Sequence, residues 1–245
     1  MPMQRLDKYL AHASGLPRKR VRAVIRQGRV RVDGVVIRDS AHPVDDPTVM
    51  LDGEVQGARI EIAVFHKATG THCTVGDPIG RRSLTEAAHQ LLDLGLHPVG
   101  RLDADTSGLL VFARDGQLTQ RLLHPRHKVY KTYQATVEGD IDPGLVQRLA
   151  EGVETAHGIH PARVDSIDGQ VVTLSITLGK YRIVRRMLAN AGHPVTALHR
   201  VRLGGFSLDG LEEETWREAT EEEIAWAEQL TSGALKPKKD SPVPS

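Results

Sequence analysis

The chain has 245 residues, of which 40% are hydrophobic and 26% charged, and its formal net charge is +1. This composition is typical of a globular protein with room for two domains, and no apolar run approaches the roughly 18 residues that a membrane span requires. The start of the chain, residues 1–5, lacks the apolar core of a signal peptide, and a single cysteine, Cys73, excludes an internal disulfide. We therefore expect a cytoplasmic protein that is not bound to a membrane.

The first sixty residues predict a small unit of two helices and a hairpin. Apolar residues recur at helical spacing from Leu6 to Ala13 and again from Val21 to Ile25, and Gly28 stands where the second helix should end. Alternating valines around an Asp33-Gly34 turn predict a β-hairpin. We expect this domain to span residues 1–57, with a linker at 56–58.

The remainder, residues 60–231, predicts interleaved strands and helices without a regular βαβ period. Strands are expected at 60–65, 109–112, 133–137 and 171–177, and helices at 85–92, 116–123, 145–150 and 182–191. The fold class is therefore α+β, a small helical and hairpin domain followed by a mixed, largely antiparallel sheet with flanking helices. The proline- and lysine-rich residues 232–245 are expected to be a disordered tail.

Charge is distributed unevenly along the chain. Residues 1–42 carry ten arginines or lysines against three acids, which indicates a polyanionic partner for this end. The alternative is an ordinary solvated face, but such faces usually mix both signs of charge. The basic residues expected to contact phosphates are Arg5, Lys8, Arg18, Lys19, Arg22, Arg26 and Arg29.

This basic domain resembles a known RNA-binding module. The segments Arg5–Leu10 and Ile25–Gly34, together with the arginine-rich helix between them, are similar to the small domain first described in the fourth small-subunit ribosomal protein. The resemblance implies that the partner is structured RNA, and it leaves the reaction open.

A second resemblance covers the body of the chain. Gly100-Arg101-Leu102-Asp103, followed by Thr106 and Gly108-Leu109, resembles the central motif of RNA pseudouridine synthases, in the branch that modifies ribosomal RNA. Further matching segments follow the family's order: Lys67 with Gly70, His124–Lys128 with Lys131–Tyr133, Gly179–Tyr181 with Arg185–Met187, and His199-Arg200 with Leu203–Gly205.

The resemblance implies an isomerase that breaks the N–C1′ bond of a uridine, turns the base and joins C1′ to C5. Asp103 is the expected catalytic carboxylate, Arg185 matches the family's basic partner, and Tyr133 fits an aromatic platform for the flipped base. Substrate contacts are expected from Arg101, Lys67, Lys131 and Arg186. The reaction requires no metal and no other cofactor. Whether Asp103 attacks the ribose or the base, or removes a ribose proton, stays open.

Each residue also has a plainer interpretation. Alone, Asp103 would more often cap a turn, Tyr133 would be a core or surface tyrosine, and Arg185 a solvated charge. Asp103 and Asp105 together could hold Mg²⁺ for phosphodiester cleavage, and Cys73 with His66 and His72 hints at zinc, but neither set has enough ligands. The joint occurrence of the motifs favours the synthase.

The sequence also departs from the family pattern. Ala68-Thr69 replaces a proline-containing segment, and Arg182-Ile183 replaces a His-Gln pair, which changes the wall beside Arg185 and adds a basic group for a phosphate. These departures are the only support for a non-catalytic ribosomal RNA-binding or assembly factor. We expect a synthase acting on small-subunit ribosomal RNA, free or in an assembling subunit, with large-subunit RNA as the nearest alternative and no obligatory protein partner.

Overall fold

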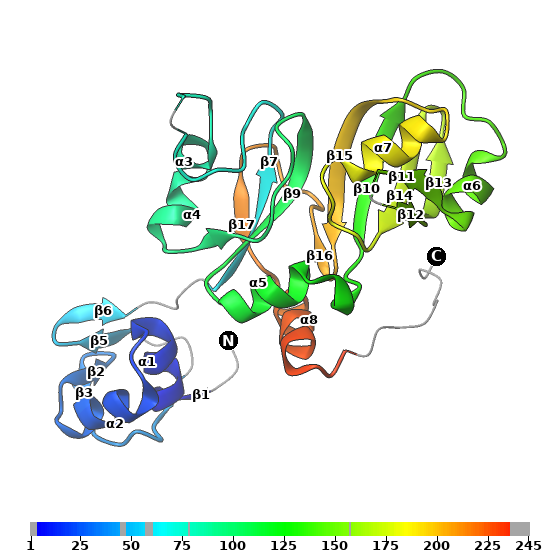
Figure 1. Ribbon diagram of the computed structural model, residues 1–245. Helices are drawn as coiled ribbons and strands as arrows, with labels where there is room; N and C mark the ends of the chain where they lie inside the picture. The colour runs from blue at the N-terminus through cyan, green and yellow to red at the C-terminus, as the bar shows by residue number, and fades with distance from the viewer. Residues whose placement is uncertain (1–3, 45–47, 57–60, 78, 157, 236–245) are drawn as a thin grey trace. The chain divides into compact units, whose positions relative to one another are not determined.

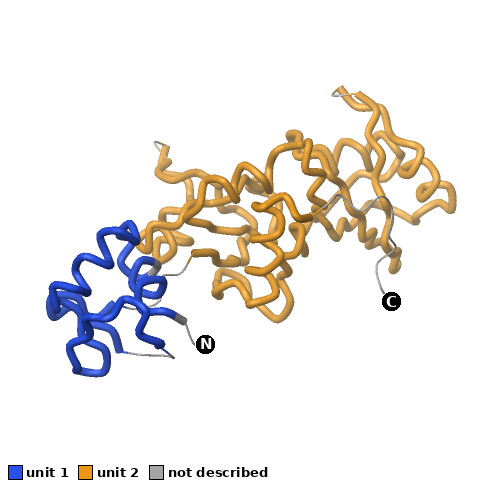
Figure 2. Tube along the Cα trace, turned by 90° about the horizontal axis from the view of Figure 1, so that it is seen from below, with its two compact units in different colours: residues 1–60 blue, residues 61–245 orange. Residues whose placement is uncertain are grey.

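The computed structural model describes residues 4–44, 48–56, 61–77, 79–156 and 158–235. The chain divides into two compact units, residues 1–60 and 61–245 (Figure 2). Of the expected linker, Gln56 ends a strand, and Gly57 and Ala58 lie outside the described residues. No helix among the described residues has the length and apolar character to cross a membrane.

Unit 1 contains the two expected helices, α1 (Leu6–Ser14) and α2 (Arg18–Arg26). Gly15 ends α1 with a φ of 69°, and Gly28 follows α2 with a φ of 76°, both in the left-handed region that glycine tolerates. The apolar faces of the helices pack on the sheet through Leu6, Leu10 and Ile25, which are fully buried.

The strands of unit 1 are short and antiparallel. The expected hairpin is β2 (Val30–Val32) and β3 (Val35–Val36), and it belongs to a sheet of order β3-β2-β5-β6. The other strands are β5 (Val49–Leu51), β6 (Glu54–Gln56), and the separate pair β1 (Gln4–Arg5) and β4 (Pro43–Val44).

Unit 2 is built on a mixed sheet of order β13-β14-β10-β15-β9-β7-β17 (Figure 1). Every pairing in it is antiparallel except that of β9 with β15 at the centre, which is parallel. This agrees with the expected mixed, largely antiparallel fold. The main strands are β7 (Ile62–Lys67), β9 (Thr106–Ala113), β10 (Lys131–Val137), β13 (Arg163–Asp168), β14 (Val171–Ile176), β15 (Val195–Leu203) and β17 (Trp216–Glu218).

Shorter strands lie at the margins. β8 (His97–Pro98) pairs with β9, β16 (Phe206–Ser207) pairs with β15, and β11 (Val153–Thr155) with β12 (Gly158–His160) forms a separate ribbon.

Some helices of unit 2 begin at a residue whose side chain caps them. Asp115 caps α5 (Gly116–Leu123), as its position before the glycine predicts, and Thr220 forms a capping box with Glu223 at the start of α8 (Glu221–Ser232). The expected helix at 85–92 is instead two pieces, α3 (Leu84–Ala87) and α4 (His89–Asp93), because Ala88, with a φ of −134° and a ψ of 28°, leaves the helical conformation. The other helices are α6 (Leu145–Glu151), α7 (Ile183–Asn190) and the 3-10 turn η1 (Pro125–His127).

The core of unit 2 joins α5 and α8 to the sheet. Leu118 and Leu122 of α5 and Leu230 of α8 pack with Leu109 and Val111 of β9. The structure also extends beyond the expected end of this domain at residue 231, because α8 includes Ser232 and Leu235 packs against the same core. Of the expected tail, residues 236–245 lie outside the described part of the chain.

Candidate active site and RNA-binding face

The loop that carries Asp103 connects β8 to β9 and is held by backbone contacts. The Leu102 N–H donates to the Cys73 Sγ at 3.3 Å, the Gly70 N–H donates to the Ala104 carbonyl at 2.7 Å, and the Thr106 N–H donates to the Asp103 carbonyl at 3.0 Å. These bonds fix the backbone on both sides of Asp103. The Asp103 carboxylate is partly buried. It accepts no hydrogen bond and forms no ion pair with a described residue.

The parallel pairing of β9 with β15 requires glycine at position 108. Gly108 has a φ of 108°, and a Cβ placed there would lie 2.3 Å from the Arg200 carbonyl oxygen. The absence of a side chain therefore lets β15 approach β9 directly behind the Asp103 loop. This approach sets the position of Arg200 relative to Asp103.

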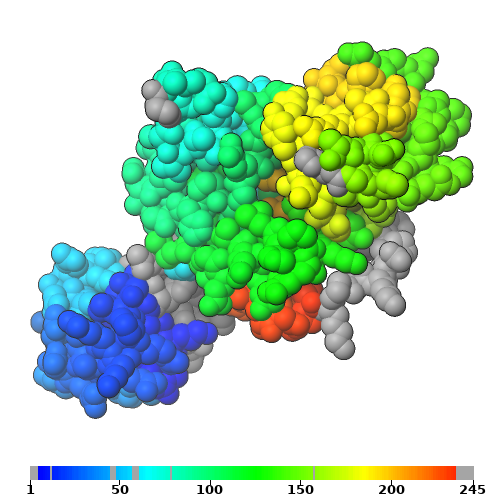
Figure 3. Space-filling model, in the orientation of Figure 1, coloured from blue at the N-terminus to red at the C-terminus, as the bar shows by residue number. Residues whose placement is uncertain are grey.

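Asp103 faces a cavity of about 460 Å³ in unit 2. The segments around it, coloured green for residues near 100–130 and yellow for those near 180–200, border a hollow on the face seen in Figure 3. Leu123, Ile183 and Leu198 contribute apolar walls. The charged and aromatic residues that line the cavity are Arg101, Asp103, Lys131, Tyr133, Lys180, Tyr181, Arg182 and Arg200.

Among the described residues that line this cavity, Asp103 is the one carboxylate, against five basic side chains. Tyr133 on β10 is buried, with 8% of its surface exposed, and it lies opposite Arg200 in the register of β10 with β15. A single acid and an aromatic ring within a basic cavity suit a polyanion that delivers one planar base to a carboxylate.

Arg185 does not contact Asp103 in this structure. Its Nη2 donates to the Asp105 carbonyl at 2.8 Å and lies 3.4 Å from an Asp105 carboxylate oxygen, and its Nη1 donates to the Val195 carbonyl. Arg182 also pairs with Asp105, at 2.8 Å, although the sequence suggested that it was available for a phosphate. Arg185 thus supports the Asp103 loop through the neighbouring acid, and it does not line the cavity.

Lys67 also lies outside the cavity. The side chain is fully buried, and its Nζ donates to the Ala68 and Thr71 carbonyls at 2.8 and 2.9 Å. Burial lowers the pKa of this amine. Lys67 therefore closes the turn from which Gly70 holds the Asp103 loop, and the expectation that it contacts substrate has no geometric support.

Of the other residues expected to contact substrate, two line the cavity and one does not. Arg101 is exposed where it lines the cavity, and Lys131 lines it from β10 as a buried amine. Arg186 does not line it, and its guanidinium lies 5.3 Å from the centre of the Tyr181 ring.

Neither metal interpretation gains support from these positions. Asp105, the second carboxylate of the magnesium hypothesis, is paired with two arginines, and the Cys73 sulfur accepts a hydrogen bond from the backbone. The described residues contain no group of three or more potential metal-ligating acids, histidines or cysteines.

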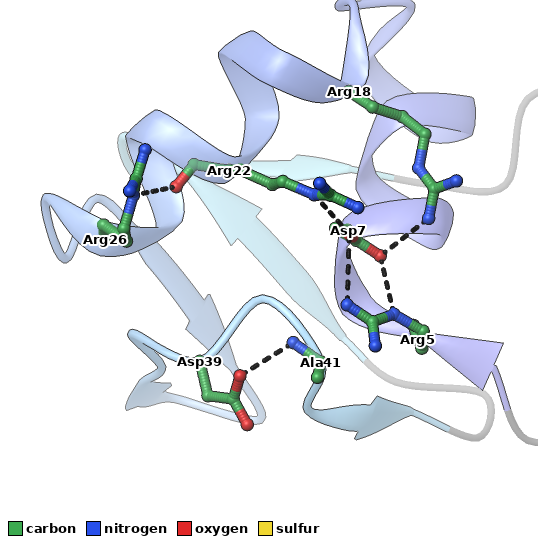
Figure 4. Close-up of polar contacts among 7 residues, drawn as sticks. All are labelled: Arg5, Asp7, Arg18, Arg22, Arg26, Asp39 and Ala41. Atoms are coloured by element: carbon green, nitrogen blue, oxygen red, sulfur yellow. Dashed lines mark hydrogen bonds and ion pairs between the residues drawn. The ribbon is translucent and has the colours of Figure 1, made fainter.

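The basic face of unit 1 is organised around a buried acid. Figure 4 shows the Asp7 carboxylate receiving hydrogen bonds from Arg5, Arg18 and Arg22, at 3.2, 3.1 and 2.7 Å for the closest pairs. Asp7 is fully buried, whereas about half of each arginine side chain is exposed. These arginines therefore form one cluster with an internal counter-charge, and their outer surfaces still face solvent.

The remaining basic residues expected to bind RNA are also exposed. Arg29 pairs with Asp52, Arg26 donates to the Arg22 carbonyl, and Lys8 and Lys19 have no ion pair with a described residue. Lys8 lies on α1, and Lys19 and Arg26 lie on α2, so both helices present basic side chains that have no ion pair with a described residue.

Two of the cavity's basic residues, Lys180 and Arg200, had no assigned substrate role in the sequence analysis, although both lie within segments that resemble the family. Arg200 is the least accessible, because only 4% of it is exposed. Its alternation with Arg202 on a strand was the available signal, but the strand itself was not predicted.

Comparisons with known proteins find the same family for the catalytic unit by sequence and by structure. Residues 61–190 match the family model described as RNA pseudouridylate synthase, and residues 4–48 match the S4 domain. A crystal structure of a pseudouridylate synthase superimposes with a TM-score of 0.63 at 31% identity, covering 91% of this chain and 99% of that one.

Two named relatives cover most of the chain. A ribosomal small subunit pseudouridine synthase A from Vibrio cholerae is 36% identical over 234 residues, which are 90% of this chain and 98% of the relative. A ribosomal large subunit pseudouridine synthase B from Yersinia pestis is 34% identical over 229 residues, 88% of this chain and 72% of the relative. The chain, an S4 domain joined to a catalytic unit with this cavity, belongs to the RNA pseudouridine synthases, a family of isomerases.

Proposed function

We propose that this enzyme isomerises one uridine of ribosomal RNA, with Asp103 as the catalytic carboxylate and small-subunit RNA as the substrate. The observation that carries the assignment of Asp103 is its position as the one carboxylate among the described residues of a basic cavity that also contains Tyr133. The relatives support the choice of RNA. The small-subunit relative is 36% identical to this chain and the large-subunit relative 34%, so the similarity agrees with small-subunit RNA as the first candidate.

The proposal gives each residue of the site a separate role. Tyr133 stacks on the uracil that leaves the RNA helix, and Asp103 acts on the nucleotide while N1 separates from C1′. Arg185 and Arg182 hold Asp105 and so keep the Asp103 loop in place. Arg101 is exposed at the cavity and binds the RNA backbone. Unit 1 contributes affinity through phosphate contacts from its basic face.

The test uses ribosomal RNA transcripts whose uridines carry tritium at C5. Because C5 becomes bonded to C1′, each pseudouridine formed releases one tritium. We expect release from the small-subunit transcript without added metal and in the presence of a chelator. Asp103→Asn should lower release by about 10³-fold or more and leave RNA binding unchanged. Asp93→Asn, which removes an exposed carboxylate of α4, is the matched control and should retain full activity.

Large-subunit RNA is the second candidate, because the Yersinia pestis relative is almost as similar. Release from the large-subunit transcript alone would select it. Binding without release from either transcript or from partly assembled subunits would instead support a non-catalytic assembly factor.

A further inference from the structure

Two buried basic residues of the cavity are not used by the roles proposed above. Lys131 on β10 is 5% exposed, and Arg200 on the adjacent strand β15 is 4% exposed. Lys131 lies two residues from Tyr133 on one face of β10, and Tyr133 is paired with Arg200 in the sheet register. Both cations are therefore neighbours of the tyrosine that is expected to carry the base, and all three residues line the same cavity.

Neither residue forms an ion pair with an acid in the part of the chain that the structure describes. The Lys131 Nζ donates to the Val129 and Thr177 carbonyls at 3.2 and 3.3 Å, and the Arg200 Nε donates to the Leu109 carbonyl at 2.9 Å. The Arg200 Nη2 is buried without a hydrogen-bond partner among the described residues. Burial of a cation without a counter-charge is costly, so two such groups at one cavity indicate a site that an anion completes.

The other ionisable groups at the cavity are Arg101, Lys180, Arg182, the phenols of Tyr133 and Tyr181, and the single acid Asp103. Asp103 forms no ion pair or hydrogen bond with Lys131 or Arg200 in the described structure, so it does not supply that anion. Burial, and then the charge of Arg200, lowers the pKa of Lys131 to about 8. Lys131 is therefore still largely protonated at neutral pH.

The reaction itself produces an anion at this place. When the N1–C1′ bond breaks, its electron pair stays with the base, and the negative charge is shared by N1, O2 and O4 of the uracil. C5 then bonds to C1′ and loses its proton, while N1 takes up a proton, so no oxidant or reductant is needed. Addition of a carboxylate to C6 of the base would likewise place negative charge on O4, so the conclusion holds for each route open to Asp103.

We propose that Lys131 and Arg200 form a two-cation site that binds the negative charge of the uracil while it is detached from the ribose. The inference rests on the proposed function, since it requires that the cavity hold a uridine. A backbone phosphate is a less suitable occupant, because the exposed Arg101 and Lys180 offer it contacts without desolvation, whereas Lys131 and Arg200 lie beside Tyr133.

Single-turnover rates and RNA affinities of variants distinguish the two possible occupants of this site, the uracil anion and a backbone phosphate. An interaction that exists only when charge develops affects the rate and leaves substrate binding unchanged. We expect Lys131→Met to slow tritium release by about 10²-fold or more at saturating enzyme, with an unchanged Kd for RNA. Lys131→Arg and Arg200→Lys, which keep a positive charge, should retain more activity than Lys131→Met and Arg200→Met. Circular dichroism spectra should match the wild type.

The pH profile adds a readout that a purely structural role would not change. Lys131 is charged below its folded pKa and neutral above it, so the wild-type rate should fall as the pH rises through about 8. Arg200→Met removes a charge that lowers this pKa, so the fall should move to higher pH. Lys131→Arg should abolish this fall of the rate with pH.

The outcomes are distinguishable. If the wild type releases no tritium from any ribosomal RNA, the proposed function fails. If the wild type is active and the methionine variants are folded and equally fast, or weaken RNA binding without slowing release, the two-cation site is wrong while the function stands.

Discussion

The buried Asp7 carboxylate holds together three arginines of the basic face of unit 1, which is the candidate RNA-binding face. The hydrogen bond from Arg5, followed by those from Arg22 and Arg18, holds the pKa of this buried carboxyl far below its ordinary value. A carboxyl with a lowered pKa in the folded state stabilises the protein above its unfolded pKa, near 4, and the contribution is lost as the pH falls below that value. Arg5, Arg18 and Arg22 are therefore structural residues in addition to candidate RNA contacts.

Asp7→Asn should destabilise unit 1 by about 2 kcal/mol, because three clustered guanidiniums lose their counter-charge. Hydrogen exchange of amides in α1 and α2 measures this within the intact chain. Between pH 4 and 3 the wild type should lose stability and the variant should change less. Asp52→Asn, which breaks the exposed pair with Arg29, is the control and should have little effect. Equal protection in Asp7→Asn and the wild type would contradict this role.

At the scale of elements, the parallel contact between β9 and β15 connects the Asp103 loop to Arg200. Gly108→Ala should destabilise unit 2 by about 3 kcal/mol or more, because the added methyl group meets backbone atoms of Arg200 at a φ of 108°. Thermal unfolding followed by the fluorescence of Trp216 and Trp226 measures the change, and tritium release should fall with it. Gly116→Ala in α5 is the control, since it has no neighbour within 4 Å of the new Cβ and should be neutral or slightly stabilising.

The elements that the sequence predicted well are those with local signals. Periodicity and capping residues gave α1, α2 and α5 with boundaries close to those observed. The sequence analysis missed β15, because polar and basic residues interrupt its apolar ones, and because its partner β9 is distant in the chain. The break at Ala88 also lacked a signal, since neither glycine nor proline marks it.

The distinction between local sequence signals and contacts between distant segments also applies to the site. Asp103, from the central motif, and Lys131 and Tyr133, from a second matching segment, line one cavity. The pairing of Arg185 with Asp105, and the closure of a turn by Lys67, depend on tertiary contacts between distant segments. A sequence motif can identify such residues as part of a site, but it does not say which of them face the substrate.

At the scale of the whole molecule, the two units have separate hydrophobic cores. A change on the exposed surface of unit 1 should therefore alter RNA affinity and leave the chemical step in unit 2 intact. Lys8, Lys19 and Arg26 suit this test, because they are exposed and are not bound to Asp7. Arg18 and Arg22 do not, because their loss would also destabilise the unit.

Replacement of Lys8, Lys19 and Arg26 together by glutamine should weaken RNA binding and reduce the slope of log Kd against log salt by about 2 to 3, since each phosphate contact contributes about 0.7 to 0.9. The single-turnover rate at saturating enzyme should equal that of the wild type. Titrations between low and moderate salt measure the slope, and a second variant with Lys8→Arg, Lys19→Arg and Arg26→Lys keeps the charge and should bind normally. An unchanged slope in the glutamine variant would place the RNA on another face of unit 1. A slower chemical step at saturation would instead mean that the two units act together during catalysis.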